Sequence, residues 1–192
     1  MFKGQIKQAI LIFIVLSIII GIIYPLFITG IAQVFFPSQA NGSLIYRNGK
    51  PVGSVLIGQA FNDPKYFWGR ISATSPVSFN AASSSGSNLG PSNSALLDAV
   101  KGRIKALRTV DPDNKSPIPV DLVTSSASGL DPHISLAAAY YQAVRIARLR
   151  GLSESTIKIL IAKHTSNRLF GLIGDPVVNV LELNLALDAY KK

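Results

Sequence analysis

The chain has 192 residues, which fits one domain with a short additional segment, because domains most often contain roughly 100–150 residues. Hydrophobic residues make up 48% of the chain and charged residues only 15%, so the apolar residues are expected to be concentrated in one segment. The absence of cysteine excludes disulfides, thiolate metal sites and a cysteine nucleophile, and the net charge of +9 comes from scattered basic residues without interleaved aromatics, which argues against nucleic-acid binding.

A long apolar segment lies near the N-terminus. No charged residue occurs between Lys7 and Arg47, and residues 9–28 read AILIFIVLSIIIGIIYPLFI. Twenty helical residues rise about 30 Å, which is the thickness of the hydrocarbon core of a bilayer. The sequence therefore predicts a transmembrane helix over residues 9–30, and the span is expected to end between Ile28 and Phe36.

A cleaved signal peptide and a buried core helix are the alternatives to this anchor. The apolar core of a signal peptide has about 7–15 residues and is followed by a small-x-small cleavage site. The segment here is longer, and Gly30-Ile31-Ala32 matches such a site poorly. These differences favour a membrane anchor.

The charges that flank the anchor predict its direction. Lys3 and Lys7 precede it without any acidic residue, and positive flanks tend to stay in the cytoplasm. We therefore expect a cytoplasmic tail at residues 1–8 and an extracytoplasmic domain at residues 40–192, held at the inner membrane by a single span.

The first elements of the domain are indicated by turn residues. Two short strands, Gly42–Tyr46 and Val52–Ile57, flank Asn48-Gly49, a dipeptide that tolerates the positive φ angles of a tight hairpin. Residues 72–94 then carry no charge and are rich in Ser, Asn, Gly and Ala. This composition is typical of a loop or linker.

Helical patterns occupy most of the remaining chain. Apolar residues with helical spacing predict an amphipathic helix at residues 94–109, and a proline-rich segment then leads to a candidate strand at Val120–Thr124. Asp131 as N-cap and Pro132 at the first helical position predict a second helix that ends before Gly151. Ser153 is expected to cap a third helix that ends near Lys163.

The C-terminal segment Val177–Tyr190 fits two patterns. Its leucines alternate as in a strand, whereas Asn179 and Glu182 have the spacing of a capping box, which favours a helix. The predicted fold class is therefore a single α/β (α+β) domain with short strands and about four helices, preceded by one transmembrane helix.

Catalytic chemistry has little support in these residues. Several serines precede Asp131 and His133, but there is no G-x-S-x-G motif, and Asp131 is already expected to cap a helix. The two histidines belong to no HExxH motif, and the Gly/Ser loops at 83–90 and 125–129 lack the phosphate-binding pattern of a P-loop. We therefore predict no catalytic residue and no metal ligand.

Three arginines near the end of the second predicted helix, Arg145, Arg148 and Arg150, allow two interpretations. They either dock on an acidic partner or form a solvated helix face, and the solvated face is favoured.

Many separate segments match one protein family in the same order: Tyr24-Pro25, Leu56–Gln59, Tyr66–Arg70, Ser87–Asn93, Val120–Thr124, Ser128–Ser135 and Asn179–Asp188. Over essentially its whole length the chain closely resembles the C subunit of the Kdp-type potassium-transporting ATPase of bacteria. The resemblance implies an assembly with a channel-like potassium-binding subunit, a P-type ATPase catalytic subunit and a small membrane subunit, which together import potassium at the expense of ATP.

The resemblance also implies that this subunit has no cofactor of its own. The family is described as a catalytic chaperone that raises the ATP affinity of the pump subunit, with ATP bound by that subunit or in a transient ternary complex. Because ATP is cytoplasmic, an extracytoplasmic domain cannot touch it, so direct nucleotide contact rests on the resemblance alone and no nucleotide-binding residue is assigned. An anchored periplasmic ligand-binding module or hydrolase remains the alternative; the fragment 40–192 would then bind a ligand or show activity.

The matches to the family are dense in two loops, which become the candidate partner-binding segments. Small Gly and Ser side chains let a backbone approach another surface closely, and Asn side chains supply amide donors and acceptors. The candidate partner-binding residues are Ser87, Asn88, Gly90, Asn93, Ser128, Gly129, Asp131 and His133.

Overall fold

The computed structural model describes the backbone of residues 2–190 and the side chains of residues 4–190. The chain divides into two compact units, Met1–Leu44 and Ile45–Lys192. Each unit is described by itself.

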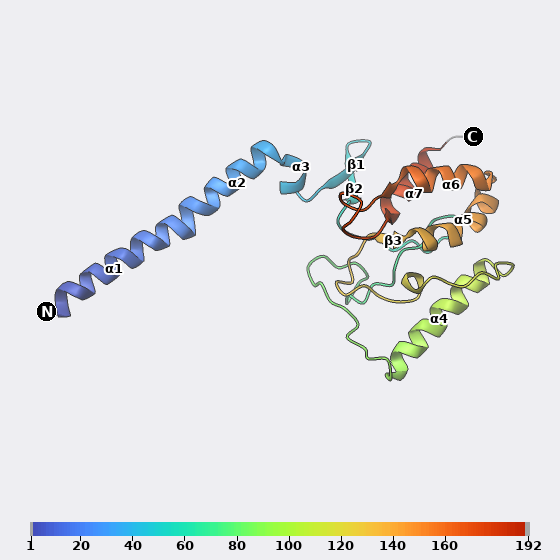
Figure 1. The fold of residues 1–192 in the computed structure, drawn as a ribbon, viewed down its shortest axis with the longest axis horizontal. Helices are drawn as coiled ribbons and strands as arrows, with labels where there is room; N and C mark the ends of the chain where they lie inside the picture. Colours follow the sequence, from blue (N-terminus) through green and yellow to red (C-terminus); the bar gives the residue numbers. More distant parts are fainter. Residues whose placement is uncertain (1, 191–192) are drawn as a thin grey trace. The chain divides into compact units, whose positions relative to one another are not determined.

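The N-terminal unit is mainly one continuous helix (Figure 1). It comprises α1 (Phe2–Ile18), a π-helical turn (Ile19–Ile23) and α2 (Tyr24–Phe35), and the short α3 (Pro37–Ala40) follows. Pro25 lies just after the π turn, where its ring would otherwise clash with the carbonyl group of Gly21, so the wider turn lets the helix continue past the proline.

This helix is long and apolar enough over Gly4–Phe35 to cross a membrane, and its apolar side chains are exposed within the structure. An apolar surface of this length without protein neighbours agrees with a single-pass membrane protein. The helix includes the predicted 9–30 segment and extends beyond it at both ends.

The second unit is an α+β domain with short strands, as predicted. A hairpin of β1 (Leu44–Arg47) and β2 (Lys50–Ser54) turns at Asn48 and Gly49, which both have positive φ. The other elements are α4 (Ser94–Val110), a 3-10 turn (Val120–Leu122), β3 (His133–Ser135), α5 (Leu136–Arg150), α6 (Glu154–Lys163), β4 (Thr165–Ser166), β5 (Val177–Asn179) and α7 (Val180–Ala189).

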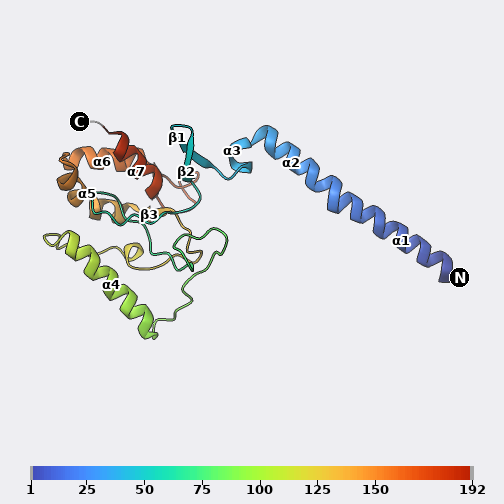
Figure 2. The ribbon, with the colours of Figure 1, turned by 180° about the vertical axis from the view of Figure 1, so that it is seen from behind.

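The second sheet has the order β3-β5-β4 with antiparallel pairs, and Val178 lies opposite both Ile134 and Thr165. Figures 1 and 2 show α5, α6 and α7 grouped together, while α4 lies apart from them on another side of the domain. Large apolar side chains of the core come from these helices, from the sheet, from the 3-10 turn and from the loop at 67–68: Phe67, Trp68, Leu107, Leu122, Ile134, Ile146, Ile157, Ile161, Leu183 and Leu187.

Polar caps fix the starts of four helices. The side chains of Asn93, Ser135, Ser153 and Asn179 each accept a hydrogen bond from a backbone N–H in the first turn of the following helix. Gly151 ends α5 in the left-handed conformation, as its sequence position predicted. The C-terminal segment combines both of its patterns, because the strand β5 leads directly into the helix α7.

Three predicted elements differ from the structure. The helix expected to start at Asp131-Pro132 starts at Leu136, because His133–Ser135 pairs with β5 instead. The strand expected at Val120–Thr124 is wrong: Val123 N–H and Thr124 Oγ1 both donate to the carbonyl group of Val120, which closes a tight turn. The second hairpin strand ends at Ser54, where the Ile57 N–H donates to the Ser54 carbonyl group.

Candidate partner-binding surface

The irregular segment 64–70, which begins in a turn, leads to the candidate surface and is held by side-chain amides rather than by a strand. Gln142 Oε1 accepts from the Trp68 N–H at 2.8 Å, and its Nε2 donates to the Trp68 carbonyl group at 3.1 Å. Asn184 makes the same pair of bonds with Phe67, at 2.9 and 3.0 Å. Each buried side-chain amide therefore makes the two hydrogen bonds that a neighbouring strand would make, and so satisfies backbone groups that cannot reach water.

Two arginines complete the support of this segment. Arg145 donates to the carbonyl groups of Pro64 and Tyr66 at 2.8 and 3.1 Å, and to Gln142 Oε1 at 2.7 Å. Arg103 donates to the Gly69 carbonyl group at 2.9 Å, and both guanidinium groups lie against the Trp68 ring.

The expectation of a solvated helix face is wrong for Arg145, whereas Arg148 is exposed and Arg150 is half-buried. Arg145 is 1% exposed and belongs to the core, while Arg148 pairs with Asp111 at 2.9 Å and Arg150 with Asp188 at 2.9 Å. Burial lowers the pKa of the Arg145 guanidinium to about 10, so it remains charged at neutral pH.

Segment 64–70 places Arg70 beside two of the predicted residues. Arg70 contacts the Asp131 carboxylate at 3.2 Å and donates to the Ser125 carbonyl group at 3.0 Å. The other carboxylate oxygen of Asp131 accepts from the His133 N–H at 2.9 Å and lies 3.3 Å from His133 Nδ1. Asp131 therefore holds an arginine and a histidine together, instead of capping a helix.

The electrostatics of this trio follow from its partial burial. Burial by itself raises the pKa of Asp131, but the hydrogen bonds from His133 and Arg70 outweigh it, and the net pKa is lowered. Arg70 was missed as a site residue by the sequence analysis, because the segment Tyr66–Arg70 was read only as a family match and its contact with Asp131 spans 61 positions.

Ser128 and Gly129 lie beside this trio and join two loops. The Ser128 carbonyl group accepts from the Ser85 N–H and from Ser84 Oγ, both at 3.0 Å. Gly129 has φ +67°, and a side chain there would collide with the Ser85 carbonyl oxygen and the Thr74 methyl group. The contact between the loops therefore requires glycine at this position.

The remaining candidate residues lie elsewhere along the 72–94 loop. Ser87, Asn88 and Gly90 are exposed, and Asn88 adopts a positive φ of 53°. Asn93 has a structural role, because its side chain accepts from the Ala95 N–H at 2.9 Å and caps α4. The structure thus brings Ser128, Gly129, Asp131 and His133 together and leaves Ser87, Asn88 and Gly90 as a separate exposed stretch.

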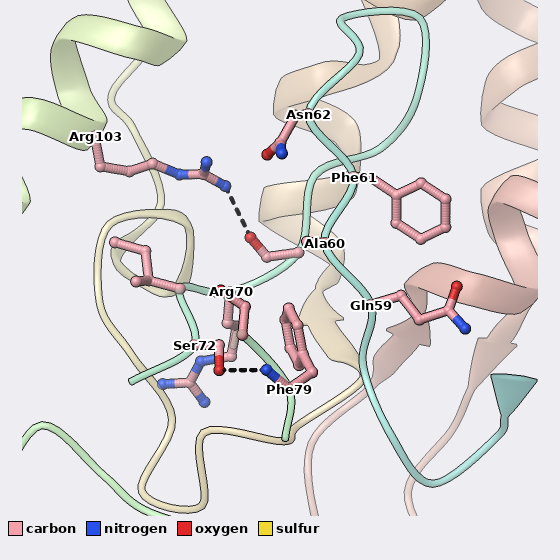
Figure 3. Close-up of a pocket in the computed structure, with 11 residues that line it drawn as sticks. Gln59, Ala60, Phe61, Asn62, Arg70, Ser72, Phe79 and Arg103 are labelled. Atoms are coloured by element: carbon pink, nitrogen blue, oxygen red, sulfur yellow. Dashed lines mark hydrogen bonds between the residues drawn. The ribbon is translucent and has the colours of Figure 1, made fainter. Parts of the chain in front are cut away.

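Arg70 borders two hollows in the surface. Figure 3 shows the smaller one, of about 150 Å³, where Arg103 lies on one side and Ser72 Oγ accepts from the Phe79 N–H. The larger one, of about 430 Å³, is lined by apolar residues that include Val120, Ile134 and Val177 and by the polar residues Asp121, Asp131, His133 and Asp175. Such a combination of apolar and polar lining residues is typical of protein interaction sites.

Several backbone donors in and next to the two Gly/Ser loops are already engaged in this arrangement. The N–H groups of Ser85, Gly129 and Leu130 donate to oxygen atoms of Ser126 or Ser128 within the loops. These three N–H groups are therefore not available to a phosphate group. Among residues 4–190, no three His, Asp or Glu side chains come together in a way that could hold a metal ion.

Among the described residues, one helix is long and apolar enough to span a membrane and is followed by an α+β domain, which is consistent with the class of single-pass membrane proteins. Residues 6–189 match the family described as the K+-transporting ATPase, c chain (KdpC). The chain therefore belongs to the KdpC family, which confirms the resemblance found in the sequence.

Individual relatives cover nearly the whole chain and carry the description "potassium-transporting ATPase KdpC subunit". The relative from Ralstonia nicotianae is 60% identical over 188 residues, which are 98% of this chain and 92% of the relative. The Polaromonas naphthalenivorans relative is 60% identical over 189 residues, 98% of this chain and 96% of its own length. The Dechloromonas aromatica relative is 58% identical over 190 residues, 99% of this chain and all of its own length.

Proposed function

We propose that this chain is a non-catalytic accessory subunit of an ATP-driven potassium import complex, needed for assembly and for high ATP affinity of the pump subunit. The observation that carries the proposal is the match to potassium-transporting ATPase subunits over residues 6–189. Its partners would be the channel-like potassium-binding subunit, the P-type catalytic subunit and the small membrane subunit.

The proposed orientation places the domain outside the cytoplasm. It rests on Lys3 and Lys7 before the anchor and on the absence of charge between Lys7 and Arg47. Because ATP is cytoplasmic, an outside domain would change ATP affinity indirectly, through contacts with the membrane-embedded subunits. ATP itself would be bound by the pump subunit.

A reporter that works only in the cytoplasm, fused to the C-terminus, tests this orientation. The reporter is expected to stay inactive, whereas the same reporter fused to the N-terminus is expected to be active. An active C-terminal fusion would reverse the topology and make direct contact with ATP plausible.

The proposed docking surface combines the Arg70–Asp131–His133 trio with the exposed stretch Ser87–Gly90. Three features support it: the loops are fixed against each other at Gly129, the hollow beside His133 is open, and the exposed stretch contributes no apolar side chain to the core. A surface that is fixed before binding loses little conformational freedom when a partner docks.

A triple variant, Ser87→Ala, Asn88→Gly and His133→Ala, tests this surface. Glycine at position 88 keeps the positive φ while removing the amide, and Asn93 is left intact because it caps α4. Co-purification with the transport subunits is expected to fall. The matched control, Ser155→Ala with Lys158→Ala on exposed positions of α6, is expected to assemble normally. Equal recovery of complex with both variants would refute this docking surface.

A further inference from the structure

A short turn between β4 and β5 exposes several large apolar side chains that take no part in the core. Within the segment 168–175, called here the apolar turn, four large side chains point into solvent. Their exposed fractions are 59% for Leu169, 86% for Phe170, 83% for Leu172 and 65% for Ile173. Contiguous exposed apolar side chains of this kind mark an interaction site rather than ordinary surface.

The backbone of the apolar turn holds these side chains outward. Leu169 and Ile173 exchange backbone hydrogen bonds of 2.9 and 3.0 Å, and the N–H groups of Gly171 and Leu172 donate to the carbonyl groups of Arg168 and Leu169. Phe170 and Gly171 have positive φ, which closes the turn tightly. The turn is therefore a preformed projection that satisfies its own donors at residues 169, 171, 172 and 173.

Lipid tails offer no hydrogen bonds to a backbone, so the four internal bonds of the turn lower the cost of placing it at the membrane surface, where the remaining backbone groups of the tip can still reach water and headgroups. The side chains of residues 169–174 contain no donor or acceptor, whereas a protein interface carries about one hydrogen bond per 100–200 Å². At the base of the turn, Arg168 pairs with Asp175 at 3.3 Å, and both side chains are at least half exposed. This arrangement of an apolar tip above a charged base matches the boundary between acyl chains and headgroups.

The covalent tether keeps the domain within reach of a bilayer. Nine residues, 36–44, join the end of α2 to the second unit, and they span about 32 Å at most when fully extended. A domain of this size has a radius of gyration of about 15 Å, so the tether cannot move it further away than about one domain diameter.

We propose that the apolar turn inserts its tip into the surface of the lipid bilayer in which the chain is anchored. The occupant is therefore lipid, at the level where headgroups meet acyl chains. The turn gives the domain a second attachment to the membrane and limits the orientations in which its docking surface meets the transport subunits. Insertion depends only on the anchor and the tether, so it is independent of the side of the membrane on which the domain lies.

A single fluorescent label on the full-length chain tests the proposal. Because the chain has no cysteine, Leu172→Cys provides a unique site for an environment-sensitive fluorophore. The matched control is Ile159→Cys on α6, another apolar side chain that is 69% exposed. Both proteins are reconstituted into vesicles without any other protein, and lipids with a quencher near the headgroup are added. Trp68 fluorescence verifies that each variant retains its core.

The label at position 172 is expected to shift to shorter wavelength and to lose intensity with quencher lipids, whereas the label at position 159 stays water-exposed. A water-exposed, unquenched label at position 172 in vesicles overturns the proposal. If that label becomes protected only after the transport subunits are added, the turn binds protein instead of lipid. Failure of the unlabelled wild-type chain to form a complex, with normal lipid quenching at position 172, would count against the proposed function and leave the lipid contact supported.

Discussion

Replacement of Arg145 by methionine tests the clamp that holds segment 64–70. The methionine keeps an unbranched apolar side chain of similar length but removes a guanidinium group that donates to Pro64, Tyr66 and Gln142. Hydrogen bonds to charged groups contribute about 1.5–3 kcal/mol each, and a buried acceptor that is left without a donor costs about 1–3 kcal/mol, so the two carbonyl groups that lose their donor account for most of the effect. We expect a loss of about 3–5 kcal/mol, a large part of the roughly 5–15 kcal/mol that stabilises a typical domain.

The assay follows from the composition of the chain. Trp68 is the only tryptophan, it is 5% exposed, and Arg145 lies 5.0 Å from its ring centre, so its fluorescence reports on this region during urea unfolding in detergent. The control Arg168→Met removes an exposed ion pair and is expected to cost about 0–1 kcal/mol. A loss below about 1 kcal/mol for Arg145→Met would show that water or neighbouring groups replace the arginine, and the clamp would be refuted.

Three further changes give separate tests of the loops and the anchor. Gly129→Ala is expected to destabilise the domain by about 1–3 kcal/mol in urea unfolding, because it adds strain at positive φ and a collision with Ser85. The control Gly90→Ala places its new methyl group where no atom lies within 4 Å, so it should change stability by less than about 0.5 kcal/mol. The folded-state pKa of Asp131 is lowered below its ordinary value of 3.8, so its contribution to stability is present above that pH and is lost as the pH falls through the folded-state pKa. Urea unfolding at successive pH values should therefore show a stability difference between wild type and Asp131→Asn that shrinks below about pH 4; a constant difference would contradict the assigned contacts. Ile18→Arg places a charge within the span, at a cost of about 2.5–3.5 kcal/mol on translocon-derived scales, and should reduce the membrane-bound fraction in cell fractionation.

Elements that depend on local patterns could be predicted from the sequence. The apolar helix, the Asn48-Gly49 turn and the starts of α4, α6 and α7 follow from hydropathy, turn chemistry and caps that lie within a few residues. These signals are local, because the atoms that form each hydrogen bond are close in sequence.

The errors arose where distant residues compete for the same groups. Asp131-Pro132 is a good helix start by local rules, but Arg70 occupies the Asp131 carboxylate and β5 draws the following residues into a strand. Arg145 was read as solvated because charge is usually exposed. In the structure Arg145 lies on the inner face of α5 with Gln142 and Ile146. Because Gln142 and Arg148, three residues to either side, are polar, no apolar stripe in the sequence indicates this face.

The candidate site was only partly accessible to sequence reasoning. Asp131 and His133 were named from family matches, and their proximity is local in sequence. The third member of the trio, Arg70, and the pairing of Ser85 with Ser128 depend on contacts between loops that have no periodic pattern. No composition rule identifies which loops pack together.

The most direct test of the accessory-subunit role is potassium-dependent ATP hydrolysis by the purified transport subunits, measured with and without this chain over a range of ATP concentrations. We expect the subunits without the chain to need more ATP for half-maximal activity or to lose potassium dependence, and addition of the full-length chain to restore both. The chain alone should not hydrolyse ATP. The same ATP requirement and the same potassium dependence in its absence would contradict the proposed function.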